Sequence, residues 1–273
     1  MNQETNIPEP QGKEIYDTNN LTNALVRRLS HSYEDHYTRE GWNVSEEFAH
    51  QQHQAYVNAL ESAGLSVSYV EPDEKCPDGV FIEDTAVVLK KHALITQVVQ
   101  RRQQELDAVE AALRVTHTVS RCGGDVQLEG GDVLNVGDTT YIGLSGRTNH
   151  LGADCLKAFM ATFGRNVVKI PVDNCLHLKS GVTYLGNGTL IAISGWFNLR
   201  RFDVEDVIYT QSGEHYAANC LRIRDKLLIP HGCPQTERLL RRFAEKNGVQ
   251  LIPLDATEFH KGGGLLTCLS IIW

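Results

Sequence analysis

The chain has 273 residues, 41% of them hydrophobic, and a formal net charge of -8, so it can bury a sizeable core and gives no sign of binding nucleic acid. No apolar run reaches the roughly 20 residues that would span a bilayer, so no membrane partner is expected. Seven cysteines without a CxxC pair argue against a disulfide framework or a zinc ribbon, and the sequence therefore predicts a cytoplasmic protein in a reducing compartment.

The first elements of the chain form a unit that lacks one strand. Residues 1–23 are predicted to be a polar extension, either ordered or poorly ordered. Residues 24–273 are expected to form a single α/β-propeller domain. "NALVRR" predicts a strand, residues 45–63 predict a helix that stops at Gly64, and "SVSYVEP" predicts a second strand. The loop at residues 29–43 is either a mobile lid over a site or a plain surface loop.

Four β-hairpins follow, spaced roughly 40 to 50 residues apart, which is a spacing typical of repeat architectures. They read "TAVVLKKHALIT", "DVLNVGDTTYIGL", "VTYLGNGTLIAI" and "CLRIRDKLLIP". After each hairpin the sequence predicts a helix, as at Leu106, Val109 and Leu113, and usually a further strand, as in "RNVVKIPV" and "GVQLIPL". The repeated unit is therefore strand, strand, helix, strand.

A closed ring follows if the last segment completes the first unit. "LLTCLSIIW" would supply the missing strand and pair with the first strand of the chain. An open α/β sheet with ordinary hairpins is the alternative. Residues 196–216 follow no pattern that we can assign.

Polar residues collect in the segments that lead into the hairpins. These segments read "CPDGVFIED", "LEGGD", "NCLHLKS" and "GGGLLTC", and they carry Asp78, Glu83, Asp84, Glu129, Asp132, His177 and Cys268. In a ring these segments would converge near the axis, and acids, a histidine and a cysteine at equivalent positions form a candidate active site. Each residue alone has a plainer interpretation. His177 can be a core histidine, Cys268 a small buried hydrophobe, and one of the adjacent pair Glu83 and Asp84 a solvated side chain on the opposite face.

Taken together, these stretches resemble the guanidine-modifying superfamily, and most closely the dimethylarginine dimethylaminohydrolase family. The resemblance runs from about residue 24 onward and rests on "CPDGVFIEDTAVV", "ALIT" followed by Arg101 and Arg102, "LEGGDVL", "GLSGRTN", "LHLKS" and "LTCLS". It implies a pentein-like fold, a five-bladed α/β propeller of ββαβ repeats with a central active site. That number of blades agrees with the number of units counted above.

The resemblance also implies roles for particular residues. Cys268 would be the nucleophile, His177 the general acid and base, and Glu129 the carboxylate that orients His177. Substrate binding would fall to the acids Asp78, Glu83 and Asp84 around the guanidinium, with Asp84 as its bidentate partner, and to Arg101 and Arg147 at the α-carboxylate. Arg102 is an alternative to Arg101, because the spacing before this pair departs from the family pattern.

The implied reaction is hydrolysis of Nω-methylated arginine to citrulline and methylamines, with no cofactor or metal. Its partner would be a small guanidino amino acid, and a homo-oligomer remains open. Deimination of unmethylated arginine and a non-catalytic arginine-binding role are the alternatives. Several acids near Cys268 should raise the pKa of its thiol, and a cationic substrate should lower it again, so we expect substrate binding to promote the thiolate.

Overall fold

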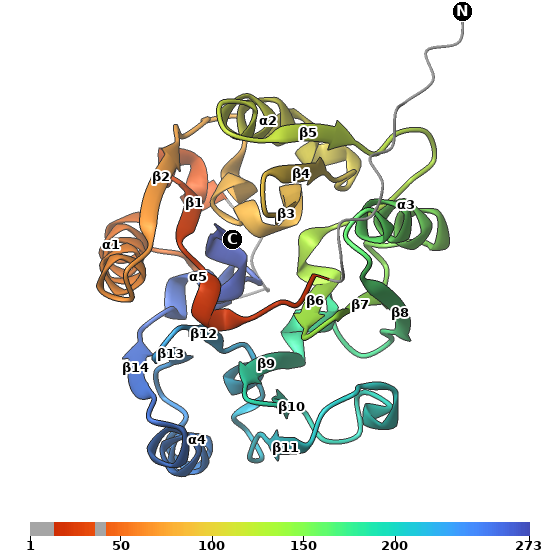
Figure 1. Ribbon diagram of the computed structural model, residues 1–273. Helices are drawn as coiled ribbons and strands as arrows, with labels where there is room; N and C mark the ends of the chain where they lie inside the picture. Colours follow the sequence, from red (N-terminus) through yellow and green to blue (C-terminus); the bar gives the residue numbers. More distant parts are fainter. Residues whose placement is uncertain (1–13, 36–41) are drawn as a thin grey trace, which may run out of the picture.

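Five three-stranded sheets surround a common centre, as the sequence predicted, and the molecule is a five-bladed α/β propeller (Figure 1). The computed structural model describes residues 14–35 and 42–273. In every sheet the middle strand is antiparallel to the inner strand and parallel to the outer strand. The open α/β sheet is therefore excluded.

The strands repeat in the same order around the ring. The inner strands are β15 (Ile271–Ile272), β3 (Ala86–Leu89), β6 (Val133–Val136), β9 (Val182–Gly186) and β12 (Leu221–Ile223). The middle strands are β1 (Asn23–Arg27), β4 (His92–Ile95), β7 (Thr139–Leu144), β10 (Thr189–Ala192) and β13 (Lys226–Pro230). The outer strands are β2 (Ser66–Val70), β5 (Thr118–Arg121), β8 (Asn166–Pro171), β11 (Asp206–Tyr209) and β14 (Gln250–Leu254). As predicted, β15 closes the ring by pairing with β1.

Helices pack on the outside of four of the sheets (Figure 1). They are α1 (Glu46–Ser62), α2 (Leu106–Arg114), α3 (His150–Ala161) and α4 (Pro234–Asn247), and a short helix α5 (Thr257–Lys261) precedes the last segment. On α2 the predicted apolar stripe of Leu106, Val109 and Leu113 is buried against β3 and β4. Each such side chain contributes roughly 2 to 3 kcal/mol through its burial. The stripes therefore fix which face of each helix meets its sheet.

The fourth sheet departs from the predicted unit. Between β10 and β11 the described chain contains a single 3-10 turn, Leu199–Arg201, instead of an α-helix. Residues 196–216, which follow no assignable sequence pattern, contain this turn and β11. The prediction of a helix after every hairpin was wrong here, because the apolar residues of this stretch, such as Phe202, pack in a cluster without helical spacing.

The last segment and the cysteines also differ from expectation. Cys268 does not lie in a strand but in a 3-10 turn, Thr267–Leu269, and only Ile271–Ile272 pairs with β1. Cys122 and Cys155 form a disulfide that joins the end of β5 to α3. A single bridge is not a disulfide framework, but the cysteine argument for a reducing compartment loses its force, since disulfides persist in oxidising surroundings.

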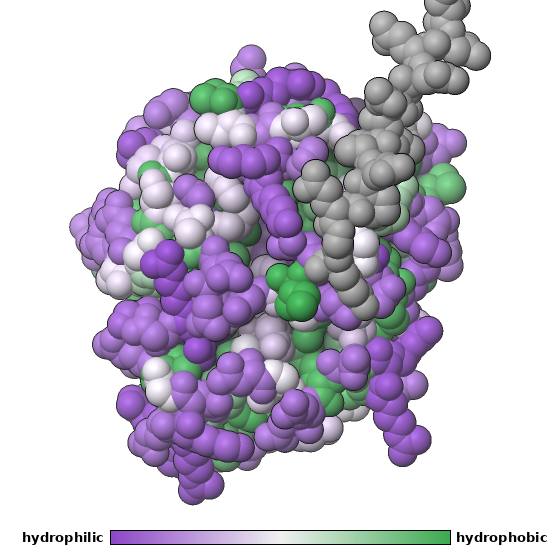
Figure 2. Space-filling model, viewed as in Figure 1, coloured by the Kyte–Doolittle hydropathy of each residue, from purple (hydrophilic) through white to green (hydrophobic). Residues whose placement is uncertain are grey.

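The segment before β1 packs across one face of the ring. The N–H of Tyr16 donates to Gly137 O at 2.6 Å, and the N–H of Arg224 donates to Thr18 O at 2.9 Å, so residues 14–22 run from the β6–β7 turn to the β12–β13 turn. Figure 2 shows polar side chains over most of this face. Residues 1–13 of the predicted extension lie outside the described residues, and so do residues 36–41 of the predicted lid. No helix in the described part of the chain is long and apolar enough to cross a membrane.

Candidate active site

A small pocket near the ring axis collects most of the predicted site residues. They are brought together because the segments that lead into the inner strands all end at the axis. The pocket is lined by Asp78, Phe81, Asp84, Arg101, Arg102, Arg147, Leu176, His177, Gly262, Gly263, Gly264 and Cys268. Of the predicted set, Glu129 lies behind His177, and Glu83 belongs to a different cavity. The two predicted chemical groups, the Cys268 thiol and the His177 imidazole, thus share one pocket.

His177 is held by the carboxylate of Glu129. Its Nε2 lies 2.7 Å from Glu129 Oε2, and both side chains are buried. The imidazole of His177 also packs closely against Gly131, where an added Cβ would lie 2.6 Å from His177 Nδ1. The second glycine of "LEGGD" is therefore required for the imidazole to occupy this position. The arrangement fixes the ring as an orienting carboxylate does in other triads.

Glu129 is itself held in place by neighbours on two sides. Its Oε1 accepts from the Val99 N–H at 3.2 Å and from Arg147 Nη1 at 3.2 Å. The arginine is partly exposed at the pocket, whereas the carboxylate is completely buried. A buried carboxylate is stable only when it is paired and hydrogen-bonded. Arg147 therefore already carries out a structural task in addition to any contact with substrate.

The acids around His177 control its charge. Burial alone would lower the pKa of His177, but the negative charges of Asp84 and Glu129 outweigh it and raise the pKa to about 9. Asp84 Oδ1 lies 3.8 Å from His177 Nε2. Burial would raise the pKa of Asp84, yet the charges of His177 and Arg102 hold that pKa below its usual value. At neutral pH the pocket therefore contains an imidazolium between two carboxylates.

The two neighbouring arginines have different environments. Arg102 is buried, and its guanidinium donates to Asp84 Oδ2 at 2.7 Å, to Glu105 Oε1 at 2.9 Å and to Phe81 O at 2.8 Å. Arg101 has a side chain that is 54% exposed, and it is ion-paired with the buried carboxylate of Asp78. A residue with three buried partners is part of the framework. Arg101 is thus the one of the pair that is free to reorient toward a ligand.

Asp84 is more constrained than a bidentate substrate partner would be. Its Oδ1 accepts from the Gly131 N–H at 3.0 Å, and its Oδ2 accepts from Arg102. An incoming guanidinium would have to share these oxygens with their present donors. A carboxylate has about four lone-pair sites, so such sharing is allowed.

Cys268 enters the pocket from the 3-10 turn that precedes β15. Its own N–H donates to Leu265 O at 3.1 Å, and the residue is half-buried. Burial, with the nearby charges of Glu83 and Asp84, raises the pKa of the Cys268 thiol to about 12. The direction agrees with the expectation from the sequence, and the thiol is protonated at neutral pH in the absence of a ligand. Gly264 before it is also required, because a Cβ there would lie 2.2 Å from the ring of Phe81.

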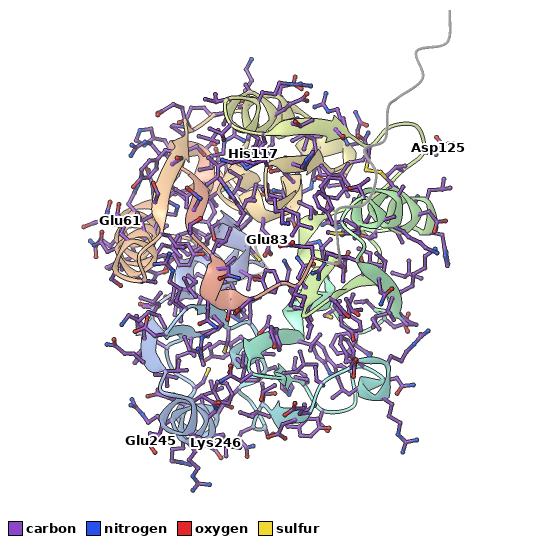
Figure 3. All side chains as sticks on the ribbon, in the orientation of Figure 1. Glu61, Glu83, His117, Asp125, Glu245 and Lys246 are labelled. Carbon is purple, nitrogen blue, oxygen red and sulfur yellow. A yellow bond between two sulfur atoms is a disulfide. The ribbon has the colours of Figure 1, made fainter. Side chains whose placement is uncertain are left out.

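Glu83 lies near the centre of the ring, away from the rim that carries Glu61 and Glu245 (Figure 3). It does not line the pocket of Cys268 and instead faces a separate cavity, as the alternation of adjacent residues allows. Its Oε1 lies 2.5 Å from Lys179 Nζ, and Thr267 Oγ1 donates to its Oε2 at 3.0 Å. Burial outweighs the charge of Lys179 and raises the pKa of Glu83 to about 7. Glu83 therefore supports the turn that carries Cys268 from the other side.

Asp132 has a supporting role that sequence reasoning did not assign. Its carboxylate accepts from the hydroxyls of Ser145 and Thr148, each at 2.7 Å, and from the Leu178 N–H at 2.9 Å. It thereby joins the segment beside His177 to the end of β7. Its position directly before β6, equivalent to that of Asp84 shortly before β3, was the sequence signal for this role.

The pocket also contains a group of side chains that could hold a metal ion. Ligand-type atoms of Asp84, Glu129 and His177 lie within 4.8 Å of one another, close enough to hold such an ion.

Comparisons with known proteins agree on one family. The family model described as N,N dimethylarginine dimethylhydrolase, eukaryotic, matches residues 28–195. The chain is 36% identical over 260 residues to N(G),N(G)-dimethylarginine dimethylaminohydrolase of Streptomyces coelicolor, covering 91% of this chain and 95% of that one. It is 31% identical over 224 residues to the protein of the same name in Pseudomonas aeruginosa, covering 81% and 87%.

Solved structures extend the comparison to the fold. A mutant of the Pseudomonas aeruginosa enzyme complexed with citrulline matches with a TM-score of 0.85 and 28% identity, covering 93% of this chain and 99% of that one. The N-terminal domain of ArgZ, an arginine dihydrolase from cyanobacteria, matches with a TM-score of 0.79 and 21% identity, covering 92% and 96%. At that identity the second match supports the fold alone.

Proposed function

Since the chain belongs to the dimethylarginine dimethylaminohydrolase family and is a hydrolase, we propose that it cleaves Nω-methylated arginine to citrulline and dimethylamine or methylamine. The observation that carries this proposal is the pair of His177 and Glu129, 2.7 Å apart, beside the pocket that Cys268 also lines. A thiol, an imidazolium and an orienting carboxylate are the groups that a covalent hydrolysis of a guanidinium needs. Asp78, Asp84, Arg101 and Arg147 complete the proposed site.

Substrate would bind by exchanging ion pairs. The guanidinium would take Asp78 and share Asp84, while the α-carboxylate would take Arg101 and Arg147, which are now paired with Asp78 and Glu129. Asp78 and both arginines would exchange their present pairs for charge-assisted bonds to the substrate, while Glu129 keeps its bonds to His177 and to the Val99 N–H, so each buried charge stays paired. Because Glu83 faces the other cavity, we assign it to support of the Cys268 turn and not to direct contact with the guanidinium.

The first chemical step begins once substrate binding has released the thiol proton of Cys268 to solvent, because His177 already holds its own proton. The thiolate attacks the guanidinium carbon, and the His177 imidazolium donates its proton to the departing nitrogen as the C–N bond breaks. Dimethylamine leaves, and an S-linked thiouronium remains on Cys268. A pKa of about 9 suits His177 to this step, since an acid must hold its proton at neutral pH until the leaving group needs it.

The second step uses the same histidine as a base. Neutral His177 accepts a proton from water, the resulting hydroxide adds to the thiouronium carbon, and the C–S bond breaks. The hydroxyl proton of the product passes to the departing sulfur, so neutral citrulline leaves and Cys268 returns to the thiol form that it holds without a ligand. Glu129 acts as a positioning residue throughout, because it fixes the ring and stabilises its charged form.

Product analysis with purified protein tests this proposal. Asymmetric dimethylarginine and arginine are supplied separately, and citrulline is measured together with dimethylamine or ammonia. We expect citrulline and dimethylamine in equal amounts, no turnover by Cys268→Ser, and normal turnover by the matched variant Cys233→Ser, whose thiol is buried outside the pocket. Ammonia from arginine would make the protein a deiminase instead, and no product from either would leave a binding role.

A further inference from the structure

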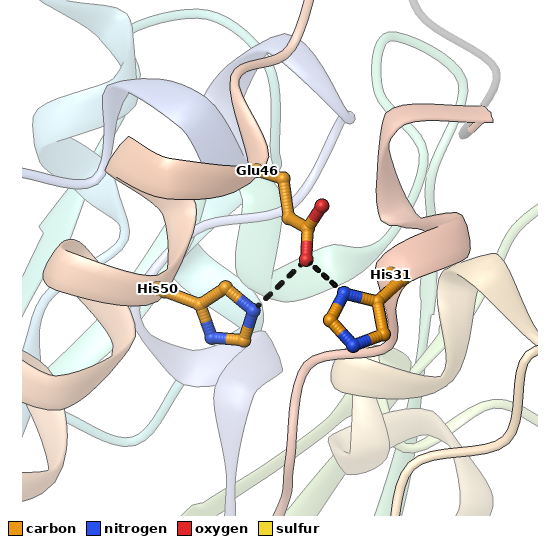
Figure 4. A group of neighbouring side chains, drawn as sticks. All are labelled: His31, Glu46 and His50. Carbon is orange, nitrogen blue, oxygen red and sulfur yellow. Dashed lines mark hydrogen bonds and ion pairs between the residues drawn. The ribbon is translucent and has the colours of Figure 1, made fainter.

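Three side chains with metal-binding atoms converge at the start of α1 (Figure 4), and none of them lines the pocket of Cys268. Glu46 and His50 lie one turn apart on α1, a spacing that puts both on the same face of a helix. His31 comes from the 3-10 turn His31–Asp35 that precedes them. The three ligand atoms lie within 4.8 Å of one another.

The two imidazoles point at one oxygen atom of Glu46. His50 Nε2 lies 3.3 Å from Glu46 Oε1, and His31 Nδ1 is hydrogen-bonded to the same oxygen. The imidazole ring centres of His31 and His50 are 6.4 Å apart, so an ion can lie between them without forcing the rings together. Two imidazole nitrogens and one carboxylate oxygen are the ligand set of many three-residue zinc sites.

The backbones that carry these ligands are fixed independently of any ion. The N–H of His31 donates to Glu74 Oε1 at 3.2 Å, and the N–H of Ser32 donates to Glu74 Oε2 at 2.9 Å. The N–H of Glu46 donates to Glu34 Oε1 at 3.0 Å. Carboxylates that brace a site in this way position its ligands and add negative charge around it. Binding would therefore cost little rearrangement.

We propose that His31, Glu46 and His50 form a surface site for a divalent transition-metal ion of the zinc class, with the remaining coordination filled by water. The ion replaces the protons that now lie between the imidazoles and the shared carboxylate. Two nitrogen ligands out of three select against Ca²⁺ and Mg²⁺, which prefer oxygen. Both imidazoles are exposed, which leaves the ion open to exchange with solvent.

An ion here would tie the turn that contains His31 to α1. Tyr33 of the same turn is buried and packs against Phe81, with ring centres 6.2 Å apart, and Phe81 borders the Cys268 pocket. The expected consequence is stabilisation of the folded state, because a ligand that binds only the folded chain raises its apparent stability by mass action. No part in the reaction is proposed.

The test is titration of the metal-stripped full chain with two ions. Binding of Co²⁺ is measured by visible absorption, and binding of Zn²⁺ is measured by calorimetry and by the change in melting temperature. Glu46→Gln and His50→Gln should each weaken binding at least ~10-fold and abolish the metal-induced rise in melting temperature. The matched variant His150→Gln removes an exposed histidine from the first turn of α3 and should bind like the parent.

Asp84, Glu129 and His177 at the pocket can bind a second metal ion. The readout is therefore the difference in metal affinity between the parent and each variant. Melting curves in EDTA should coincide for all four proteins, which shows that the variants fold. Unchanged binding in both Glu46→Gln and His50→Gln, or no saturable binding by the parent, would overturn the proposal.

Discussion

The charge of the substrate should activate Cys268. With a pKa of about 12, the thiol is ionised to a fraction of only ~10⁻⁵ at pH 7. A guanidinium held about 4 Å from the sulfur at an effective dielectric constant of about 20 favours the thiolate by about 4 kcal/mol. That energy lowers the pKa of Cys268 by about 3, since each pKa unit corresponds to about 1.4 kcal/mol. Binding alone should therefore raise the thiolate population ~1000-fold.

The assay is a pH titration of ultraviolet thiolate absorbance, with Cys268→Ser subtracted to remove the signals of other cysteines and tyrosines. An arginine analogue that binds without turnover supplies the positive charge, and citrulline supplies nearly the same shape without it. We expect the titration of Cys268 to move to lower pH with the cationic ligand and to stay near its ligand-free position with citrulline. Equal midpoints for the two ligands would refute the electrostatic reasoning, because shape alone would then account for any change.

Three further predictions concern the framework of the site. Glu129→Gln should reduce kcat by ~10²- to 10⁴-fold and lower the pKa of His177, measured by steady-state kinetics and by imidazole NMR; an unchanged pKa would contradict the pairing. Because the pKa of His177 is raised from 6.5 to about 9, its stabilising contribution is complete below pH 6.5 and disappears as pH rises through 9, so the melting temperature should fall across that range in the parent but not in His177→Ala. Arg101→Ala should raise KM and removes the ion pair of one buried carboxylate, Asp78, whereas Arg102→Ala strands two buried carboxylates and should cost about 3 to 5 kcal/mol of stability; an equal loss of stability in the two variants would argue against their separate roles.

Most of the fold could be predicted from the sequence because each blade contains a hairpin with a local sequence signal. Turn residues between alternating apolar runs specify a hairpin, and four hairpins plus one incomplete unit leave a ring as the economical arrangement. The helix expected in the fourth sheet failed because Phe202 and its neighbours are buried without helical spacing, which a count of repeats cannot detect.

The sequence predicted which residues gather at the site, but it did not predict which hydrogen-bond and ion-pair partners each of them has. The segments that lead into the inner strands converge, so Asp78, Asp84, His177 and Cys268 meet as predicted. Which arginine is fixed depends on Asp84 and on the carbonyl of Phe81, and these meet Arg102 only once the chain has folded. Contacts of this kind, like the bridge between Cys122 and Cys155, leave no mark in local sequence.

The seam between β1 and β15 links the durability of the enzyme to its chemistry. Only Ala24 with Ile272 and Leu25 with Ile271 form the paired register, supported by the main chain of Trp273. So short a pairing is a natural place for local opening below the level of global unfolding. Because Cys268 lies three residues before this strand, each opening of the seam would also carry the sulfur away from the imidazole. Amide exchange at the seam and slow inactivation of the catalyst should therefore have a common rate, and substitutions that strengthen the seam would extend working lifetime without touching a reacting group.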